Sequence, residues 1–149
     1  KSWQPVPAIK LNSPSLPKTS VHMQKIAQRG LMILFSFTIM FHVLIIIQVI
    51  PFQHVWGGRL KTLKEMYQFE SFSILLNLCF LMIVLIKSGI MKSRIPARML
   101  KITLWMMAAF FLLNTIANLL SLTNLESWIF APVTALICIF SFILARSEN

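Results

Sequence analysis

Four apolar runs, each about as long as a lipid bilayer is thick, dominate this chain. The first, LMILFSFTIMFHVLIIIQVI, covers residues 31–50, and the others cover about residues 69–86, 102–122 and 127–145. Twenty helical residues rise about 30 Å, which matches the hydrocarbon core of a bilayer. Only 12% of the residues are charged, about half the share in a soluble domain. The sequence therefore predicts an all-α integral membrane protein, an antiparallel bundle of four transmembrane helices that run up, down, up and down.

The first 22 residues have a different character. They hold four prolines and several serines but no apolar periodicity, and proline disfavours helix at its own position and at the residue before it. We expect an extended or disordered arm over residues 1–22, with Met23 as a candidate native start. The four-helix transmembrane domain then covers residues 23–149, with an extracytoplasmic loop over residues 51–68.

The positive charges distinguish the two sides of the membrane. Five Lys or Arg precede the first helix, five lie between the second and third, and one follows the fourth. Only three lie between the first and second helices, and none lies between the third and fourth. Because cytoplasmic segments carry the excess of Lys and Arg, both termini are predicted to be cytoplasmic in a multi-pass protein of the cell membrane. Lipid headgroups account for the net charge of +10, so no nucleic-acid partner is expected.

Local signals mark the starts of two helices. A capping box is a Ser or Thr followed three residues later by Glu, and it precedes an apolar run. Two sequences fit this pattern: Thr62 with Glu65, and Thr123 with Glu126. Pro132 is expected to kink the fourth helix near its start, because proline leaves a carbonyl one turn earlier without its donor.

Polar residues gather at one depth within the apolar runs. Counted from the predicted outer boundary, Asn77, Asn114 and His42 each lie eight residues deep, which is about 12 Å by helical rise. Glu70, near the boundary, shares a helix face with Asn77, and Asn118 shares a face with Asn114. Since polar groups avoid lipid, this layer should face the bundle interior or a water-filled cavity.

Two explanations of the polar layer stay open. The asparagines could join neighbouring helices through hydrogen bonds worth about 0.6–2 kcal/mol each. Alternatively, the layer lines a small pocket that opens to the outside, with Arg59 and Glu70 at its mouth. The candidate ligand-binding residues of this pocket are His42, Arg59, Glu70, Asn77, Asn114 and Asn118.

Three classes of function fit these observations. The favoured one is binding, or help in transporting, a small polar or amphiphilic ligand from the outer side. The alternative is a structural or regulatory subunit, in a homo-oligomer or a larger membrane complex. An intramembrane enzyme built on His42, His54 and Glu70 is less favoured, because the chain has no HExxH motif, no Asp and no paired carboxylates within the membrane. No catalytic residue, metal site or cofactor is predicted, and the lipid bilayer is the partner that the composition requires.

Overall fold

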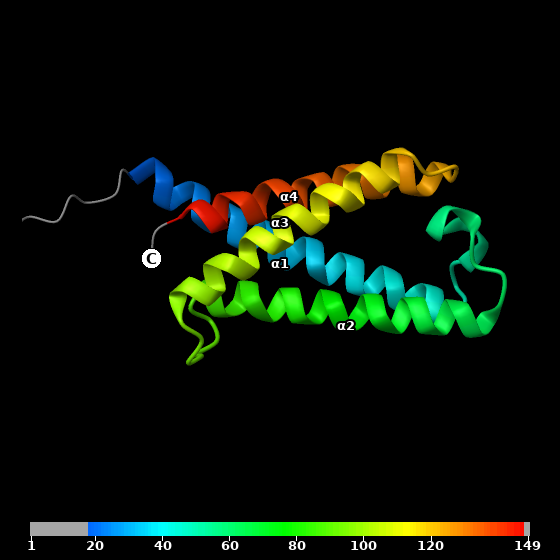
Figure 1. Ribbon diagram of the computed structural model, residues 1–149, viewed down its shortest axis with the longest axis horizontal. Helices are drawn as coiled ribbons and strands as arrows, with labels where there is room; N and C mark the ends of the chain where they lie inside the picture. Colours follow the sequence, from blue (N-terminus) through cyan, green and yellow to red (C-terminus); the bar gives the residue numbers. More distant parts are fainter. Residues whose placement is uncertain (1–17, 148–149) are drawn as a thin grey trace, which may run out of the picture.

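The computed structural model describes residues 18–147, in which the only regular secondary structure is helical. Four long helices follow one another along the chain (Figure 1): α1 (Lys18–Ile46), α2 (Leu63–Lys87), α3 (Ala97–Leu119) and α4 (Ala131–Arg146). Three shorter helices complete the order: the 3-10 helices η1 (Phe52–His54) and η2 (Trp56–Gly58), and the π-helix η3 (Glu126–Phe130). The chain thus has four helices long and apolar enough to cross a membrane, the fourth consisting of η3 and α4, as the sequence predicted.

The helix bounds differ from those of the apolar runs. Helix α1 begins at Lys18 and ends at Ile46, so residues 18–22 are helical, and the rest of the predicted arm lies outside the described residues. Helix α2 begins at Leu63 instead of about residue 69, so the connection covers residues 47–62. The reason is physical: hydropathy marks the part of a helix that lies in lipid, whereas capping groups decide where its backbone hydrogen bonds begin.

The two predicted capping boxes have different outcomes. At α2, the Thr62 hydroxyl accepts the Glu65 N–H at 3.2 Å, and the Glu65 carboxylate accepts the Thr62 N–H at 3.2 Å. At the fourth helix, the Thr123 hydroxyl instead donates to the Glu126 carboxylate at 2.9 Å. The π-helical turn η3 stands immediately before α4, at the place where Pro132 predicted a kink; such turns are a known cause of helix bending.

The four helices pack as two pairs. Helix α1 lies along α2, α3 lies along α4, and the pairs meet mainly through α1 and α4 (Figure 1). Gly30 permits the close approach of α1 to α4, since a Cβ at this position would lie 2.8 Å from Cδ2 of Phe140. The pairs diverge toward the end that carries residues 47–62, here called the loop end (Figure 1). The opposite end, which carries residues 88–96, is called the basic end.

Three phenylalanine rings join the two pairs near the middle of the bundle. Phe35 of α1, Phe80 of α2 and Phe111 of α3 contact one another, with centroid separations of 5.6–6.0 Å. A second apolar cluster holds the connection against the loop end and consists of Ile45, Val55, Leu60 and Met66. Many large apolar side chains remain exposed on the outer faces of the helices, as expected where lipid is the solvent.

Candidate functional site

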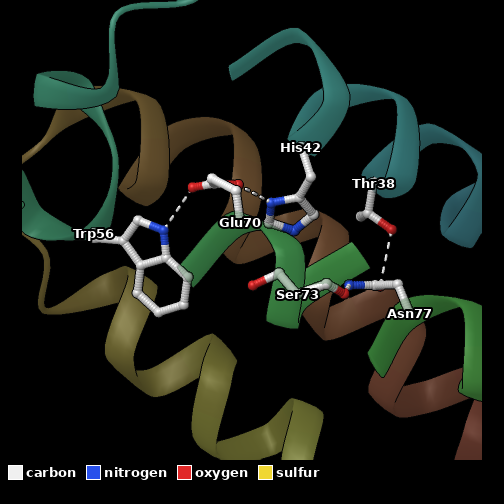
Figure 2. A network of polar contacts seen from close by, with 6 residues as sticks. All are labelled: Thr38, His42, Trp56, Glu70, Ser73 and Asn77. Atoms are coloured by element: carbon white, nitrogen blue, oxygen red, sulfur yellow. Dashed lines mark hydrogen bonds and ion pairs between the residues drawn. The ribbon is translucent and has the colours of Figure 1, made fainter. Parts of the chain in front are cut away.

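A line of polar side chains follows α2 on the side that meets α1 (Figure 2). Glu70, Ser73 and Asn77 are buried, with 0%, 8% and 8% of their surface exposed. Their spacing of three and four residues places them on one helix face. The face predicted from the sequence is therefore buried, and it lies in the half of α2 nearer the loop end.

Glu70 is the centre of the first polar group (Figure 2). Its Oε2 lies 2.5 Å from Nδ1 of His42, and its Oε1 accepts a hydrogen bond of 2.8 Å from the indole N–H of Trp56. The carboxylate is fully buried, whereas 19% of the His42 side chain is exposed. A buried carboxylate without partners costs several kcal/mol. The contacts with His42 and Trp56 therefore explain how the Glu70 carboxylate can be buried inside the bundle.

Arg59 does not take part in this group. The sequence placed Glu70 beside Arg59 at the mouth of a pocket. In the structure, Arg59 is exposed and forms no ion pair with any residue of the range 18–147. Glu70 instead lies inside the bundle, where the side chains of Trp56 and His42 point at it from neighbouring segments (Figure 2).

The backbone at Trp56 is left-handed. Trp56, Gly57 and Gly58 have φ values of +56°, +64° and +68°, and an L-residue with a bulky side chain pays roughly 1–2 kcal/mol in this region. The two glycines adopt it freely. The indole N–H bond to Glu70 and an edge contact with Phe69, at a centroid separation of 5.0 Å, offset the cost at Trp56.

The same turn reaches the second helix pair. The Gly57 N–H donates to Oε2 of Glu126 at 2.9 Å, and the hydroxyls of Ser121 and Thr123 donate to the same oxygen. Neighbouring residues of one turn therefore bind one acid on each pair: Trp56 binds Glu70, and Gly57 binds Glu126. The turn Trp56–Gly58 links the two pairs at the loop end.

Asn77 belongs to a second polar group, between α1 and α2. The hydroxyl of Thr38 donates to Oδ1 of Asn77 at 3.0 Å, and Nδ2 of Asn77 donates to the Ser73 carbonyl at 2.8 Å (Figure 2). This amide thus bonds across a helix contact, which is the arrangement expected of a residue that holds helices together.

Asn118 and Asn114 lie on the other pair. Nδ2 of Asn118 lies 3.3 Å from the hydroxyl of Thr134, which is also 3.1 Å from the hydroxyl of Thr115. Asn114 is half-buried, and its side chain makes no hydrogen bond within the described part of the chain. The structure therefore divides the six candidates: His42 joins Glu70, Asn77 and Asn118 each bond within one pair, and Asn114 and Arg59 stay apart.

The hollow at the loop end is not lined by the six candidates. It has a volume of about 480 Å³, and its lining residues are Ile50, His54, Leu122, Thr123, Asn124 and Leu125. Within residues 18–147, no group of three or more His, Cys, Asp or Glu side chains is placed to hold a metal ion. No protein-family model, curated protein or solved structure matches this chain. What the protein does therefore has to be inferred from the geometry of its polar side chains.

Sequence reasoning missed one partner of a candidate residue, Trp56, and it missed Thr115, which bonds to the Thr134 hydroxyl that Asn118 also contacts. Trp56 was not among the predicted site residues, and its bond to Glu70 was not foreseen. The two glycines that follow it were the available signal, since they permit a left-handed turn. Thr115 was not singled out, because a threonine that bonds its own helix leaves no mark in the hydropathy pattern.

Proposed function

We propose that this protein crosses the cell membrane four times in up-down-up-down order and binds a small polar or amphiphilic molecule between its two helix pairs. Four apolar helices support the membrane assignment. The excess of Lys and Arg at the basic end supports an orientation with this end and both termini in the cytoplasm. The loop end then faces outward, and the polar groups around Glu70 lie in the outer half of the bilayer.

The observation that carries the proposal is the burial of Glu70 against His42 and Trp56. A well-packed apolar pair often stabilises a fold as much as a buried ion pair does, or more. Ionisable residues inside a membrane are rare and mark ligand or ion sites. Holding helices together does not require a carboxylate and an imidazole, so this pair fits a role in binding.

The His42 ring and the side-chain amide of Asn114 are two further groups that could form hydrogen bonds with a bound ligand. His42 uses Nδ1 toward Glu70, and its ring is partly exposed. Asn114 lies three residues beyond Phe111 on α3, and Asn77 lies three residues before Phe80 on α2. Both amides therefore stand one turn from the phenylalanine contact, on its loop-end side. A ligand between the pairs would rest on the rings and meet the Asn114 amide.

The sharpest test of binding is Asn114→Ala in the purified protein. Lysophosphatidylcholine, a single-chain amphiphile with a polar head, is titrated while thermal unfolding is followed in detergent. We expect the wild-type Tm to rise with the amphiphile and this rise to be lost in Asn114→Ala. The Tm without amphiphile should stay unchanged, because the Asn114 side chain has no hydrogen bond to lose within the described chain.

Two control variants separate binding from helix packing. Asn77→Ala removes an interhelical bond and should lower the Tm without amphiphile by the equivalent of about 0.6–2 kcal/mol. Thr103→Ala removes a hydroxyl that bonds to the Met99 carbonyl of its own helix, in the basic half of α3, and should change neither the Tm nor its rise with the amphiphile. Binding between the pairs would be contradicted if wild type gained no stability, or if Asn114→Ala responded to the amphiphile as wild type does.

The unbonded amide of Asn114 also favours a second candidate function. Such a side chain on the flank of a transmembrane helix can bond to a helix of another protein or of a second copy. The chain would then be a structural or regulatory subunit. Native mass spectrometry from a mild detergent distinguishes the two functions, because a subunit should leave the membrane with a stoichiometric partner and lose it in Asn114→Ala.

A further inference from the structure

A second hollow lies at the basic end, where the chain passes from α2 to α3. Its volume is about 340 Å³, and it is bounded by the last turn of α2, the loop and the first turn of α3. The wall combines polar and apolar side chains, among them Lys87, Lys92, Ser93, Met91, Ile95 and Leu100. A hollow with cationic and apolar walls suits an amphiphile that has an anionic head.

Backbone and side-chain bonds shape the loop around this hollow. Gly89 has φ +76°, which turns the chain at the end of α2 as the left-handed C-terminal cap does. The Met91 N–H then bonds back to the Leu85 carbonyl at 3.1 Å, and the Ile95 N–H donates to the Ser93 hydroxyl at 3.2 Å. These bonds place Lys92 and Ser93 on a folded loop beside the last turn of α2.

Among the described residues that line the hollow, the charged ones are Lys87 and Lys92, and both are positive. Residues 71–125 include five Lys or Arg and no Asp or Glu. The acids of the described chain stand at the loop end: Glu65 and Glu70 near the start of α2, and Glu126 beside Gly57. Lys101 lies close enough to Lys87 for their charges to repel each other.

We propose that the hollow binds the phosphate of an anionic phospholipid from the membrane leaflet at the basic end. Lys87 and Lys92 would contact the phosphate oxygens as point charges. Ile90, Met91 and Ile95, which are 65%, 38% and 41% exposed, would pack against the first part of the acyl chains. The apolar wall favours a lipid over free phosphate, because a free ion gains nothing from apolar contact. This inference is independent of the ligand between the helix pairs.

General attraction between basic loops and anionic lipid would also concentrate such lipids at this end. The two cases differ in geometry, because a site depends on the lysines that line the hollow and diffuse attraction depends on charge alone. Lys25 and Arg29 provide the comparison. Both are exposed on α1, which begins at the same end of the bundle (Figure 1), and neither lines the hollow.

The experiment is native mass spectrometry of the full-length protein with added phosphatidylglycerol or phosphatidylcholine of the same acyl chains. We expect one phosphatidylglycerol to bind at least about ten-fold more tightly than phosphatidylcholine. A lysine that contacts the headgroup should contribute about five-fold in affinity, so Lys87→Gln with Lys92→Gln should weaken phosphatidylglycerol binding about 30-fold. The matched variant, Lys25→Gln with Arg29→Gln, should change it less than two-fold.

Three results would overturn the proposal. An equal loss of phosphatidylglycerol affinity in the two double variants would show diffuse attraction. Displacement of phosphatidylglycerol by millimolar inorganic phosphate would show a site for the free ion. No preference for phosphatidylglycerol over phosphatidylcholine would show that the hollow has no headgroup specificity. Since Lys87 is half-buried, Lys92→Glu alone serves as a second variant, and it should abolish tight binding while helicity stays at the wild-type level.

Discussion

Replacement of Glu70 by leucine, alone and together with His42→Leu, tests the structure around the buried carboxylate. Glu70→Leu removes the partner of His42 Nδ1, at 2.5 Å, and the acceptor of the Trp56 indole N–H, at 2.8 Å. Removing one member of a buried ion pair costs about 3–5 kcal/mol. We expect the single variant to lose this much of its free energy of unfolding.

The double variant should be more stable than Glu70→Leu, although it carries one more substitution. With both ionisable groups gone, an apolar pair occupies the site, and such replacements are often neutral or stabilising. The Trp56 N–H still lacks an acceptor, which costs about 1–3 kcal/mol. His42→Leu added to Glu70→Leu should therefore restore about 2 kcal/mol of stability, the difference between the two costs.

The assay is reversible unfolding in mixed micelles by titration with a denaturing detergent, followed by circular dichroism. Gln68→Leu is the control, because Gln68 is an exposed polar residue on the same helix and its replacement should change stability by less than about 0.5 kcal/mol. The reasoning is refuted if the double variant is less stable than Glu70→Leu, or if Gln68→Leu is as damaging as Glu70→Leu.

Three other substitutions test separate contacts. Gly30→Ala should lower the Tm by the equivalent of about 1–3 kcal/mol, since its Cβ would press on the Phe140 ring; a higher Tm would disprove the close approach of α1 and α4. Glu126→Gln, which keeps a weaker acceptor, should cost about 1 kcal/mol and speed hydrogen exchange at the Gly57 amide, whereas unchanged exchange would argue against this bond. Thr62→Ala should cost about 0.5–2 kcal/mol in chemical unfolding, with Thr62→Ser near wild type; equal losses in both would exclude the cap.

The four long helices could be predicted from the sequence because lipid leaves the backbone few choices. Each polar backbone group in hydrocarbon needs a partner within its own segment, so a long apolar run has to be helical. The ends of the helices follow other rules. The start of α2 at Leu63 is marked by the Thr62 capping box, which the hydropathy pattern cannot show.

The candidate site was predictable as a set of residues and not as a set of contacts. Depth counting selected His42, and the helix face shared with Asn77 selected Glu70; both are ionisable groups, which are rare within a membrane. Their pairing depends on how α1 and α2 are rotated against each other, which is fixed by packing along their whole length. The separation of Asn77 from Asn118 has the same origin, since each amide bonds within its own helix pair.

Trp56 and Gly57 have a mechanical consequence that extends beyond their own loop. Trp56 bonds to Glu70 on one helix pair, and Gly57 bonds to Glu126 on the other. A molecule that separates the two pairs must therefore lengthen the hydrogen bond from the Trp56 indole or the one from the Gly57 amide. The segment between the first two helices thereby sets the spacing of all four.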